Sequence, residues 1–502
     1  MRNGRVTAII LTLLILSGCT AKTPEDTVEA EDEVVRENAQ EHNSETIEKH
    51  ETVIEEITTI PKPKTEQSEE PEEDFPYIRL NLDDTKPVSG VAPVQYNGKA
   101  GIINSNGKII ATPKYHLYDY MYINNYMGLD DDFTVVACDI SDKETEVYDF
   151  FGHKLSSSKY VLTFLDRDGN EAFGYFEEAT AFSEGLAVVA DALGTYHTLN
   201  KDGEILSSFV NASYKVVEIH EFHDGRARFE IIDKGIRLFG YLNDDLSIAI
   251  EPKYVFARNF SEGLALVSDG EKQGYIDVNG ELIIDLSDVG MDTYAPESGF
   301  LPYYFPTGKY DGWDFSDGLA YVCLPRDYEK CPVDNLGYFY WEKDENGKII
   351  YDRDHYASLP YGYYIDKNGN KVLEDVIGTK FVHGLAAACD PETGKCGYID
   401  KTGKFVIEPQ FELAYPFNES GIAMVTKGET GKYIGEALVG YINTKGEIVI
   451  PIEYIGSHMP PFDIESCGIV HLLKEHPDIT GTVYYFDKNG TVLGTIASDF
   501  YK

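Results

Sequence analysis

The feature of this chain that most constrains its fold is a segment that recurs along the sequence. Residues 260–284, FSEGLALVSDGEKQGYIDVNGELII, reappear with small changes at 381–407 as FVHGLAAACDPETGKCGYIDKTGKFVI. Two signatures alternate from about residue 77 onward: an aromatic followed after two residues by Gly-Leu-Ala, and a Gly-Tyr-Ile-Asp stretch followed by another glycine. A segment this short cannot bury a core alone, so the repetition predicts stacked units that share cores with their neighbours.

The second signature predicts a β-hairpin. An Asp or Asn stands three residues before a glycine, in the pairs Asp277 and Gly280, Asp366 and Gly369, Asp400 and Gly403, and Asn443 and Gly446. The Asp or Asn side chain can accept a hydrogen bond from its own turn, and glycine takes the positive φ that closes a type I turn with a bulge. β-Branched and aromatic residues on both sides suit pleated strands, so each copy is expected to form a hairpin.

The spacing of the repeats predicts units of three or four short strands. Successive aromatic starts at 182, 222 and 260 lie 40 and 38 residues apart, and about nine units fit between 77 and 502. Longer steps place insertions at 291–312 and 325–360, which we expect to decorate one face. The predicted fold class is all-β, a tandem β-hairpin repeat array that is either an open solenoid or a propeller-like closure, because the unit length permits both.

The two signatures, together with a trailing Pro-aromatic pattern such as Glu408-Pro409-Gln410-Phe411, resemble the WG β-repeat family of bacterial proteins. The resemblance spans most of 77–502 and implies an all-β repeat array used for binding, with no catalytic residues to transfer. One departure is that the Trp for which the family is named is replaced here, by Gln273, Cys396, Val439, Phe239 or Ala100. A site that depends on that Trp therefore cannot be carried over.

The first nineteen residues predict export. Arg2 and Arg5 precede an apolar run from Val6 to Leu16 that is short for a membrane span. Leu16-Ser17-Gly18-Cys19 resembles the lipobox of bacterial lipoproteins, which implies that Cys19 is diacylated and anchors the chain to the extracytoplasmic face of the membrane, in the cell envelope. The alternative is an ordinary signal peptide with a chance cysteine.

Residues 20–76 are expected to form a disordered acidic tether. They contain nineteen Asp or Glu and five Lys or Arg, with Phe75 as the sole aromatic. Such a segment buries too little apolar area to offset its ordering entropy, and its like charges extend it. Residues 77–502 form the predicted repeat domain.

The overall charge excludes some partners. Lys and Arg total 43 against 86 Asp and Glu, for a formal net charge of -43. Such a chain repels nucleic acid and anionic head groups, so we expect no nucleic-acid partner. Two interpretations of the acidity stay open: it attracts a cationic partner or calcium, or it serves solubility alone.

The cysteines predict two disulfides in the exported domain. Cys323 and Cys389 each follow a Gly-Leu-Ala segment, and Cys331 and Cys396 stand across a short loop, so we expect the pairs Cys323–Cys331 and Cys389–Cys396. The alternative is buried free thiols. Cys138 and Cys467 remain, and their pairing would join the first and last units.

A search for catalytic motifs finds none. HExxH, GxSxG and a complete GxxxxGK[ST] are absent, and no cofactor or metal site is predicted. His220 and His223 are interpreted as a solvated loop pair, and the Asp-rich turn at 166–170 has an incomplete set of calcium ligands. We therefore expect no enzyme. The alternative is a cell-envelope hydrolase or glycan-processing enzyme whose carboxylates are hidden among the many.

The aromatic residues offer a candidate ligand face. Tyr is frequent, with 36 copies, and the candidate residues are Tyr361, Tyr363, Tyr364, Trp313 and Trp341. Aromatic rings on a sheet can stack on sugars or anchor a peptide, although cross-strand packing is the commoner use of Tyr in strands. The expected function is a non-catalytic, surface-anchored binding or scaffold lipoprotein that engages a protein or a cell-envelope polymer.

Overall fold

The structure is a computed structural model that divides the chain into two units, residues 1–66 and 67–502. It describes residues 77–80, 91–96, 99–116, 132–139, 147–155, 160–209, 214–289, 314–323, 362–376, 378–390, 393–427, 438–455, 469–474 and 481–498, all within the second unit. The signal segment with Cys19 and the tether at 20–76 lie outside the described residues. Among the described residues, no helix is long and apolar enough to cross a membrane.

The repeat unit is an antiparallel sheet of three or four strands. In the fifth unit these are β16 (Phe256–Ala257), β17 (Leu264–Ser268), β18 (Gln273–Asp277) and β19 (Leu282–Asp285), paired in sequence order. Leu264 lies opposite Asp277, and the register shifts by a bulge between Tyr275 and Ile276. The hairpin that the second signature predicts is therefore confirmed in this unit.

The turn between β18 and β19 forms as its sequence predicts. The amide of Gly280 donates to the carbonyl oxygen of Asp277 at 2.9 Å, and Gly280 has a φ of 82°. Oδ1 of Asp277 accepts from the amides of Glu281 and Asn279, both at 2.9 Å. The Glu281 amide, the largest contribution, lowers the pKa of this carboxyl.

The same turn recurs throughout the described residues. The glycine amide donates to the Asp or Asn carbonyl in the pairs Asp366 and Gly369, Asp400 and Gly403, and Asn443 and Gly446, each at 2.9 Å. The glycines have φ values of 79°, 80° and 80°. The turn prediction is therefore confirmed in all four copies.

Nine units can be followed through the described residues. The first has β2 (Val91–Tyr96), β3 (Lys99–Asn104) and β4 (Ile109–His116); the second β5 (Phe133–Asp139), β6 (Tyr160–Asp166) and β7 (Glu171–Phe176); the third β8 (Glu178–Ala179), β9 (Leu186–Ala190), β10 (Tyr196–Asn200) and β11 (Ile205–Ser208). The fourth has β12 (Val216–His223), β13 (Arg226–Asp233), β14 (Ile236–Leu242) and β15 (Ile248–Tyr254), and the fifth is given above.

The remaining units follow the same plan. The sixth has β20 (Leu319–Cys323), β21 (Gly362–Asp366) and β22 (Lys371–Val376); the seventh β23 (Leu385–Cys389), β24 (Cys396–Asp400) and β25 (Phe405–Phe411). The eighth has β26 (Ile422–Lys427), β27 (Leu438–Asn443) and β28 (Ile448–Ile455); the ninth β29 (Ile469–Lys474), β30 (Gly481–Asp487) and β31 (Val492–Ser498). The units form seven sheets, because single residue pairs join the first unit to the second and the eighth to the ninth.

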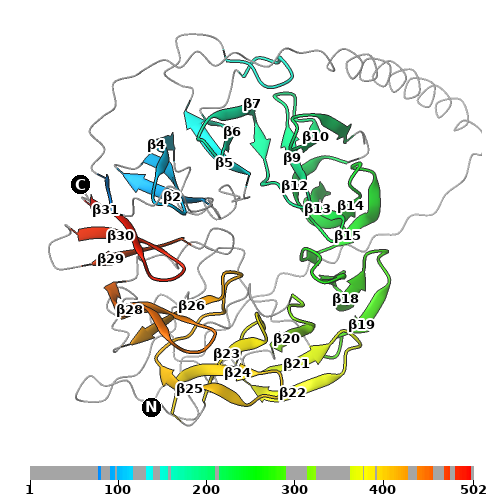
Figure 1. The fold of residues 1–502 in the computed structure, drawn as a ribbon. Helices are drawn as coiled ribbons and strands as arrows, with labels where there is room; N and C mark the ends of the chain where they lie inside the picture. Colours follow the sequence, from blue (N-terminus) through cyan, green and yellow to red (C-terminus); the bar gives the residue numbers. More distant parts are fainter. Residues whose placement is uncertain are drawn as a thin grey trace, which may run out of the picture. The chain divides into compact units, whose positions relative to one another are not determined.

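Every unit except the fourth, whose turn carries Leu246 in place of the glycine, packs its turn glycine against the outer strand of the preceding unit. An added Cβ would meet Ile250 at Gly280, Ile284 at Gly369, Leu373 at Gly403 and Ile407 at Gly446. The first unit makes the same contact with the ninth, because a Cβ on Gly107 would meet the carbonyl oxygen of Leu493 at 2.8 Å. The repeat domain is therefore closed like a propeller, as the arrangement of the labelled strands in Figure 1 shows, and is not an open solenoid.

The closure is reinforced by β1 (Tyr77–Arg79), which pairs antiparallel with β31. The Tyr77 hydroxyl donates to the carbonyl oxygen of Gly107 at 2.7 Å, and Nη2 of Arg79 donates to that of Asn106 at 2.9 Å. Residues from the first and ninth units also share one hydrophobic core. β1 thus binds the last strand and the first turn together.

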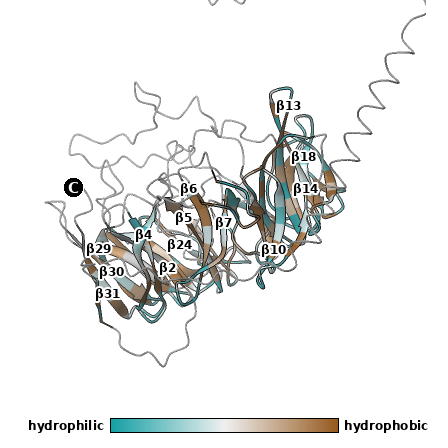
Figure 2. Ribbon diagram, turned by 90° about the horizontal axis from the view of Figure 1, so that it is seen from above, coloured by the Kyte–Doolittle hydropathy of each residue, from teal (hydrophilic) through white to brown (hydrophobic). Residues whose placement is uncertain are grey.

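Tyrosines of the Gly-Tyr-Ile-Asp signature form the core between units. Tyr275 packs on Phe315 of the next unit with ring centroids 4.9 Å apart, and Tyr241, Tyr364 and Tyr398 pack on Phe260, Phe381 and Phe417 in the same way. Each of these four tyrosines is fully buried. Figure 2 shows the apolar residues concentrated in the strands and the hydrophilic residues at many of the turns.

Candidate functional site

The fourth unit departs from the repeat at a position that is apolar elsewhere. In the fifth, sixth, seventh and eighth units, the residue paired with the signature tyrosine is Leu266, Tyr321, Ala387 and Met424. In the fourth unit the residue paired with Tyr241 is Arg228. A buried cation at a position that otherwise carries apolar side chains costs stability, which marks this unit as a candidate site.

The first strands of the third and fourth units also carry ionisable groups at matching positions. Glu178 and Glu218 each stand four residues before the aromatic that opens the repeat, Phe182 or Phe222. His220 stands two residues before Phe222, where the third and seventh units carry Thr180 and Thr379. Ionisable side chains therefore lie on β8 and β12, which are edge strands of two neighbouring sheets.

Arg228 is held by three groups. Its Nη1 donates to the carbonyl oxygen of Ala257 at 2.5 Å, Nη2 lies 3.1 Å from Nε2 of His220, and its guanidinium lies over the ring of Phe239 at 5.4 Å. Its Nε is buried and has no hydrogen-bond partner. Burial lowers the pKa of Arg228, but a guanidinium stays charged because its ordinary pKa is so high.

The contact with Arg228 fixes the protonation of His220. Since the guanidinium can only donate, Nε2 of His220 must accept, and the proton of the neutral ring is on Nδ1. Nδ1 lies 3.7 Å from Oε1 of Glu218. Burial, followed by the charge of Arg228, lowers the pKa of His220 to about 3. The imidazole is therefore neutral at physiological pH.

A small cavity opens between the third and fourth units beside these groups. Its volume is about 60 Å³, and it is lined by Glu178, Ala179, Thr180, Val188, Tyr196, Glu218, Ile219, His220 and Glu221. The Tyr196 hydroxyl donates to Oε2 of Glu178 at 2.7 Å. Burial raises the pKa of both Glu178 and Glu218, because a carboxylate loses hydration in the cavity wall. We call this the Glu178–Glu218 cavity.

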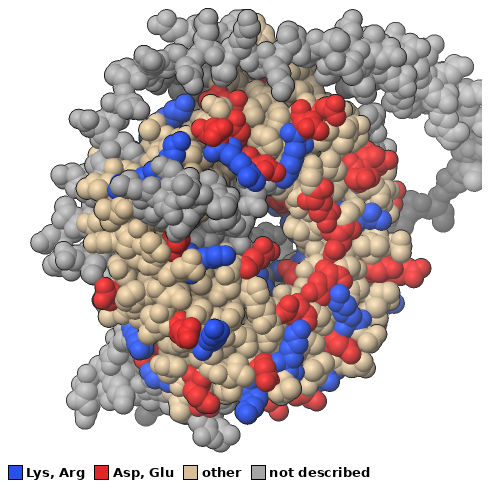
Figure 3. All heavy atoms as spheres, viewed as in Figure 1, with Lys and Arg blue, Asp and Glu red and all other residues tan. Residues whose placement is uncertain are grey.

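The charged region continues into the fifth unit. Arg258 binds Asp314 through two hydrogen bonds, from Nε to Oδ1 at 2.6 Å and from Nη2 to Oδ2 at 2.5 Å. The Tyr241 hydroxyl donates to the carbonyl oxygen of Arg258 at 2.7 Å. Figure 3 shows one face of the molecule, on which acidic side chains and scattered Lys and Arg border a hollowed centre.

Chemically, the Glu178–Glu218 cavity can hold a cation or exchange a proton. Its wall combines carboxylates of raised pKa with a neutral imidazole. Among the described residues, no group of three or more His, Cys, Asp or Glu could hold a metal ion. The Asp-rich turn at 166–170 uses Oδ1 of Asp166 to accept from the amides of Asp168 and Asn170, as the hairpin turns do.

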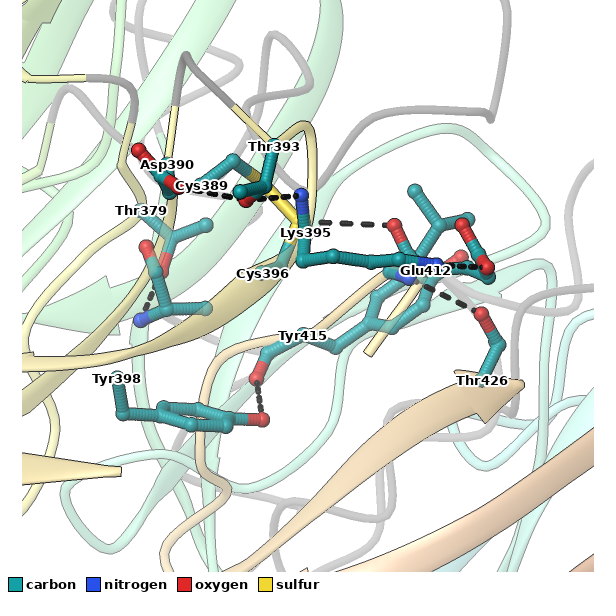
Figure 4. The surroundings of a disulfide bond; sticks show 12 residues. Thr379, Cys389, Asp390, Thr393, Lys395, Cys396, Tyr398, Glu412, Tyr415 and Thr426 are labelled. Carbon is teal, nitrogen blue, oxygen red and sulfur yellow. Dashed lines mark hydrogen bonds and ion pairs between the residues drawn. A yellow bond between two sulfur atoms is a disulfide. The ribbon is translucent and has the colours of Figure 1, made fainter. Parts of the chain in front are cut away.

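Of the predicted disulfides, Cys389–Cys396 is confirmed. The two residues are paired directly across β23 and β24, with Cα atoms 3.9 Å apart and an S–S distance of 2.10 Å. Figure 4 shows the bond beside Lys395, which pairs with Glu412, and above the hydrogen bond from Tyr398 to the carbonyl oxygen of Tyr415.

The other cysteine pairings stay predictions. In the register of the sixth unit, the residue opposite Cys323 is Gly362, the equivalent of Cys396. Cys331 and Cys467 lie outside the described residues. Cys138 is buried in the core of the first two units.

Two residues of the predicted aromatic ligand face do not lie on an exposed face. Tyr363 and Tyr364 are buried, at 6% and 0% exposure, and the Tyr364 hydroxyl donates to the carbonyl oxygen of Thr379 in the next unit. Burial and inter-unit packing leave neither ring available to stack on a ligand. Tyr361, Trp313 and Trp341 lie outside the described residues.

The interpretation of His220 and His223 as a loop pair is wrong, since both lie on β12 and His220 is largely buried. The sequence holds a signal that points to this region. The fourth unit reads FHDGRARF where its neighbour reads FSEGLALV, so Arg228 breaks the apolar pattern. Comparison of the copies position by position locates the departure.

A family model described as "WG containing repeat" matches residues 239–272, 397–433 and 440–454. A search of curated proteins finds none that matches the chain.

Similar solved structures include a eukaryotic initiation factor, with 9% identity, 88% of this chain and 91% of that chain covered, and a TM-score of 0.36. BamB from Moraxella catarrhalis has 12% identity, 72% and 98% coverage and a TM-score of 0.32. Porphyromonas gingivalis dipeptidyl peptidase 4 has 9% identity, 85% and 60% coverage and a TM-score of 0.38.

The matched segments lie in the fourth, fifth, seventh and eighth units, where the signature tyrosines Tyr241 and Tyr398 pack on the aromatic residue of the next unit. The chain therefore contains WG-type repeats at these segments.

Proposed function

We propose that the chain is a non-catalytic binding or scaffold lipoprotein, held at the extracytoplasmic face of a membrane through Cys19. The acidic residues 20–76 keep the repeat domain away from the membrane, and the domain engages a protein or a cell-envelope polymer.

The observation that carries the binding role is the group of charged residues where the repeat is otherwise apolar or neutral. Arg228, His220 and Glu218 lie together at the inner end of the fourth unit. The fifth and eighth units form the same kind of sheet with apolar residues at the position of Arg228, so the fold does not require a charged residue there. Charged residues that lower the stability of one unit, where the other units carry apolar residues, indicate a role in function.

Photo-crosslinking on intact cells tests the binding role. A photoreactive residue at Glu221, in the wall of the Glu178–Glu218 cavity, should capture a discrete partner. The same group at Leu206, which is exposed at 57% on the outer strand of the third unit, is the control. Equal capture from both positions, or none from Glu221, would contradict the proposal.

The lipid anchor has its own test. A Cys19→Ala variant should move from the membrane fraction to the soluble fraction, because an unacylated N-terminus has no hydrocarbon to insert. A variant that stays in the membrane fraction would show that the chain is held by something other than lipid on Cys19.

A second candidate function is an envelope hydrolase. It is favoured by the raised pKa of Glu178 and Glu218 in one cavity, since a protonated carboxyl can act as a general acid. Turnover of peptidoglycan or glycans by the purified chain, lost in a Glu178→Gln variant with an unchanged melting temperature, would establish it over the binding role.

A further inference from the structure

We propose that Ser208 is an activated nucleophile that takes an acyl group from a carboxylic ester, with His197 as its general base and Asp191 as the residue that orients the base. All three belong to the third unit: Ser208 ends β11, His197 lies on β10, and Asp191 directly follows β9. This covalent modification goes beyond the proposed binding role and does not depend on it.

The three side chains form a continuous line of polar contacts. Oγ of Ser208 lies 2.7 Å from Nδ1 of His197, directly across the pair of strands β10 and β11. Nε2 of the same ring lies 3.4 Å from Oδ2 of Asp191. A hydroxyl bonded to a base, which is itself oriented by a third group, is the arrangement by which proteins activate a serine.

The contact with Asp191 sets the tautomer of His197. Because a carboxylate can only accept, Nε2 of the ring carries a proton, and in the neutral ring Nδ1 accepts the hydrogen bond from Ser208. The ring of Phe151 stacks on the imidazole, with centroids 4.2 Å apart and an interplanar angle of 28°. The nitrogen that must take the proton is therefore held beside the hydroxyl that gives it.

Asp191 is fixed in place and charged. Its Oδ1 accepts from the amides of Leu193 and Thr195, at 2.9 and 2.8 Å, and Nδ1 of His153 lies 3.9 Å from its Oδ2. Burial acts to raise the pKa of Asp191, but the hydrogen bonds from His197 and from the Thr195 amide outweigh it and hold this pKa below its usual value. An ionised carboxylate here stabilises the imidazolium that forms when His197 takes a proton.

The fold does not require a histidine at this position. His197 stands where the Gly-Tyr-Ile-Asp signature has its glycine, which is Gly274 in the fifth unit and Gly397 in the seventh. The third and fifth units pair the two strands in the same register, with Ser208 opposite His197 and Asp285 opposite Gly274. The imidazole is thus an addition that strand pairing does not need, and it lies beside a hydroxyl nucleophile.

The order of burial suits attack on an external ester. β11 is an edge strand, and no other described strand pairs with its outer side. Ser208 is half-buried, whereas His197 and Asp191 are buried, with exposures of 6% and 3%. The nucleophile is therefore the most accessible of the three residues, and the base and the carboxylate lie behind it.

The reaction transfers an acyl group in two steps. Oγ of Ser208 forms a bond to the carbonyl carbon of the ester while its proton passes to Nδ1 of His197. The tetrahedral intermediate then collapses, the bond from carbon to the leaving oxygen breaks, and the imidazolium returns the proton to that oxygen. The products are O-acyl-Ser208 and an alcohol, and no other reactant is consumed.

Covalent labelling of the full purified chain at pH 8 tests the proposal. The probes are a fluorophosphonate and p-nitrophenyl acetate, and we expect peptide mass spectrometry to find both adducts on Ser208. His197→Phe, which keeps a ring against Phe151, should slow labelling about 100-fold or more, because the general base is lost. Ser207→Ala is the matched control, since the hydroxyl of Ser207 contacts that of Thr198 and no imidazole, and it should react as the wild type does.

The orienting role of Asp191 has a spectroscopic test. In Asp191→Asn the amides of Leu193 and Thr195 still need an acceptor, so the side-chain carbonyl faces them and the amino group faces His197. Nε2 then accepts, the ring proton moves to Nδ1, and Ser208 loses its base. Imidazole ¹⁵N NMR should show this change of tautomer together with a loss of labelling. Lost labelling with an unchanged tautomer would contradict the role of Asp191.

Other results overturn the inference as a whole. A wild-type chain that takes neither adduct on Ser208 has no activated serine there. Labelling of His197→Phe at the wild-type rate would show that the imidazole is not the base. A fluorophosphonate adduct without acetylation would exclude an ester as the acyl donor. Melting temperatures equal to that of the wild type would show that lost labelling in a variant does not come from unfolding.

Discussion

The hydroxyl of Ser261 donates to the carbonyl oxygen of Phe315, 54 residues later, at 2.6 Å. The bond joins the fifth unit to the sixth, and it recurs from Ser183 to Phe222 and from Ser316 to Phe381. Beside it, the carboxylate of Glu262 accepts from the amide of Gly318 at 3.0 Å. The Phe-Ser-Glu-Gly turn is thus the contact by which one unit binds the next.

The serine in this contact should contribute measurably to stability. We expect Ser261→Ala to lower the free energy of unfolding by about 1 kcal/mol, because it removes an inter-unit hydrogen bond and leaves the Phe315 carbonyl without that donor. Urea unfolding measures the change. Thr491→Ala, at an exposed hydroxyl residue, is the control. An equal loss of unfolding free energy in both variants would show that Ser261 does not stabilise the contact between units.

Two glycines of similar backbone conformation should differ in their response to alanine. Gly169 and Gly185 have φ values of 83° and 85°, so alanine is strained at both. At Gly169 a Cβ would lie 1.8 Å from the carbonyl oxygen of Ile110, whereas at Gly185 nothing lies within 4 Å. We expect Gly185→Ala to lower the free energy of unfolding by about 1 kcal/mol. Gly169→Ala should lower it clearly more, because the backbone around Ile110 must move to admit the Cβ. Thermal melts that rank the variants equally would contradict the close packing of the second unit on the first.

Reduction should destabilise the seventh unit. Cys389 and Cys396 are separated by seven residues, a loop for which the chain-entropy model gives about 2.5 kcal/mol. Dithiothreitol should lower the melting temperature of the wild type. The shift should be smaller in a Cys389→Ser, Cys396→Ser variant. A shift in that variant equal to the shift of the wild type would assign the effect to a different disulfide.

His220 should make stability depend on pH. Its folded pKa of about 3 lies below the ordinary value of 6.5, so between these values the unfolded chain binds more protons than the folded chain. Stability from this group is complete above pH 6.5 and falls as the pH drops, by about 1.4 kcal/mol per pH unit. Urea unfolding at several pH values measures the slope.

The matched variant is His220→Thr, the residue of the third and seventh units. Glu178 and Glu218 act in the opposite direction, because their raised pKa makes the folded chain the stronger proton acceptor. The difference between wild type and variant isolates the histidine. A difference that does not change between pH 7 and 4 would mean that His220 is not buried as a neutral ring.

Closure by β1 should depend on Gly494. A Cβ there would lie 2.1 Å from the Tyr77 hydroxyl oxygen, so Gly494→Val should displace Tyr77 from β31. Limited proteolysis should then cut the chain N-terminal to residue 91 faster than in the wild type. Thr495→Val, at the position paired with Ile78, is the control. Identical cleavage rates in all three proteins would show that β1 protects nothing.

How far the sequence predicts this protein is clearest in its turns. Asp277 and Gly280 prescribe their hairpin locally, because the side chain and the positive φ satisfy the turn without distant partners. The directly facing pair of Cys389 and Cys396 was predictable for the same reason, since the hairpin alone brings them together. Signals that act over a few residues are readable in one unit.

The role of the recurring tyrosines could be predicted from the sequence only in part. Their periodicity marks the units, but the partner of Tyr364 is Phe381 in the next unit, so only the stacking of sheets buries the ring. Closure was unreadable for a related reason. An open and a closed array use the same unit, and the choice rests on the angle accumulated over all of them, which brings Leu493 to Gly107.

The sequence by itself determined the repeat, the hairpin turns and the all-β class, because these depend on local conformational preference and short-range pairing. The tertiary structure decided the closure and the Glu178–Glu218 cavity. Glu178, Glu218 and Arg228 come from two units and three strands, and their proximity depends on how neighbouring sheets pack. Packing between units is set by many small contacts together, and no single segment encodes it.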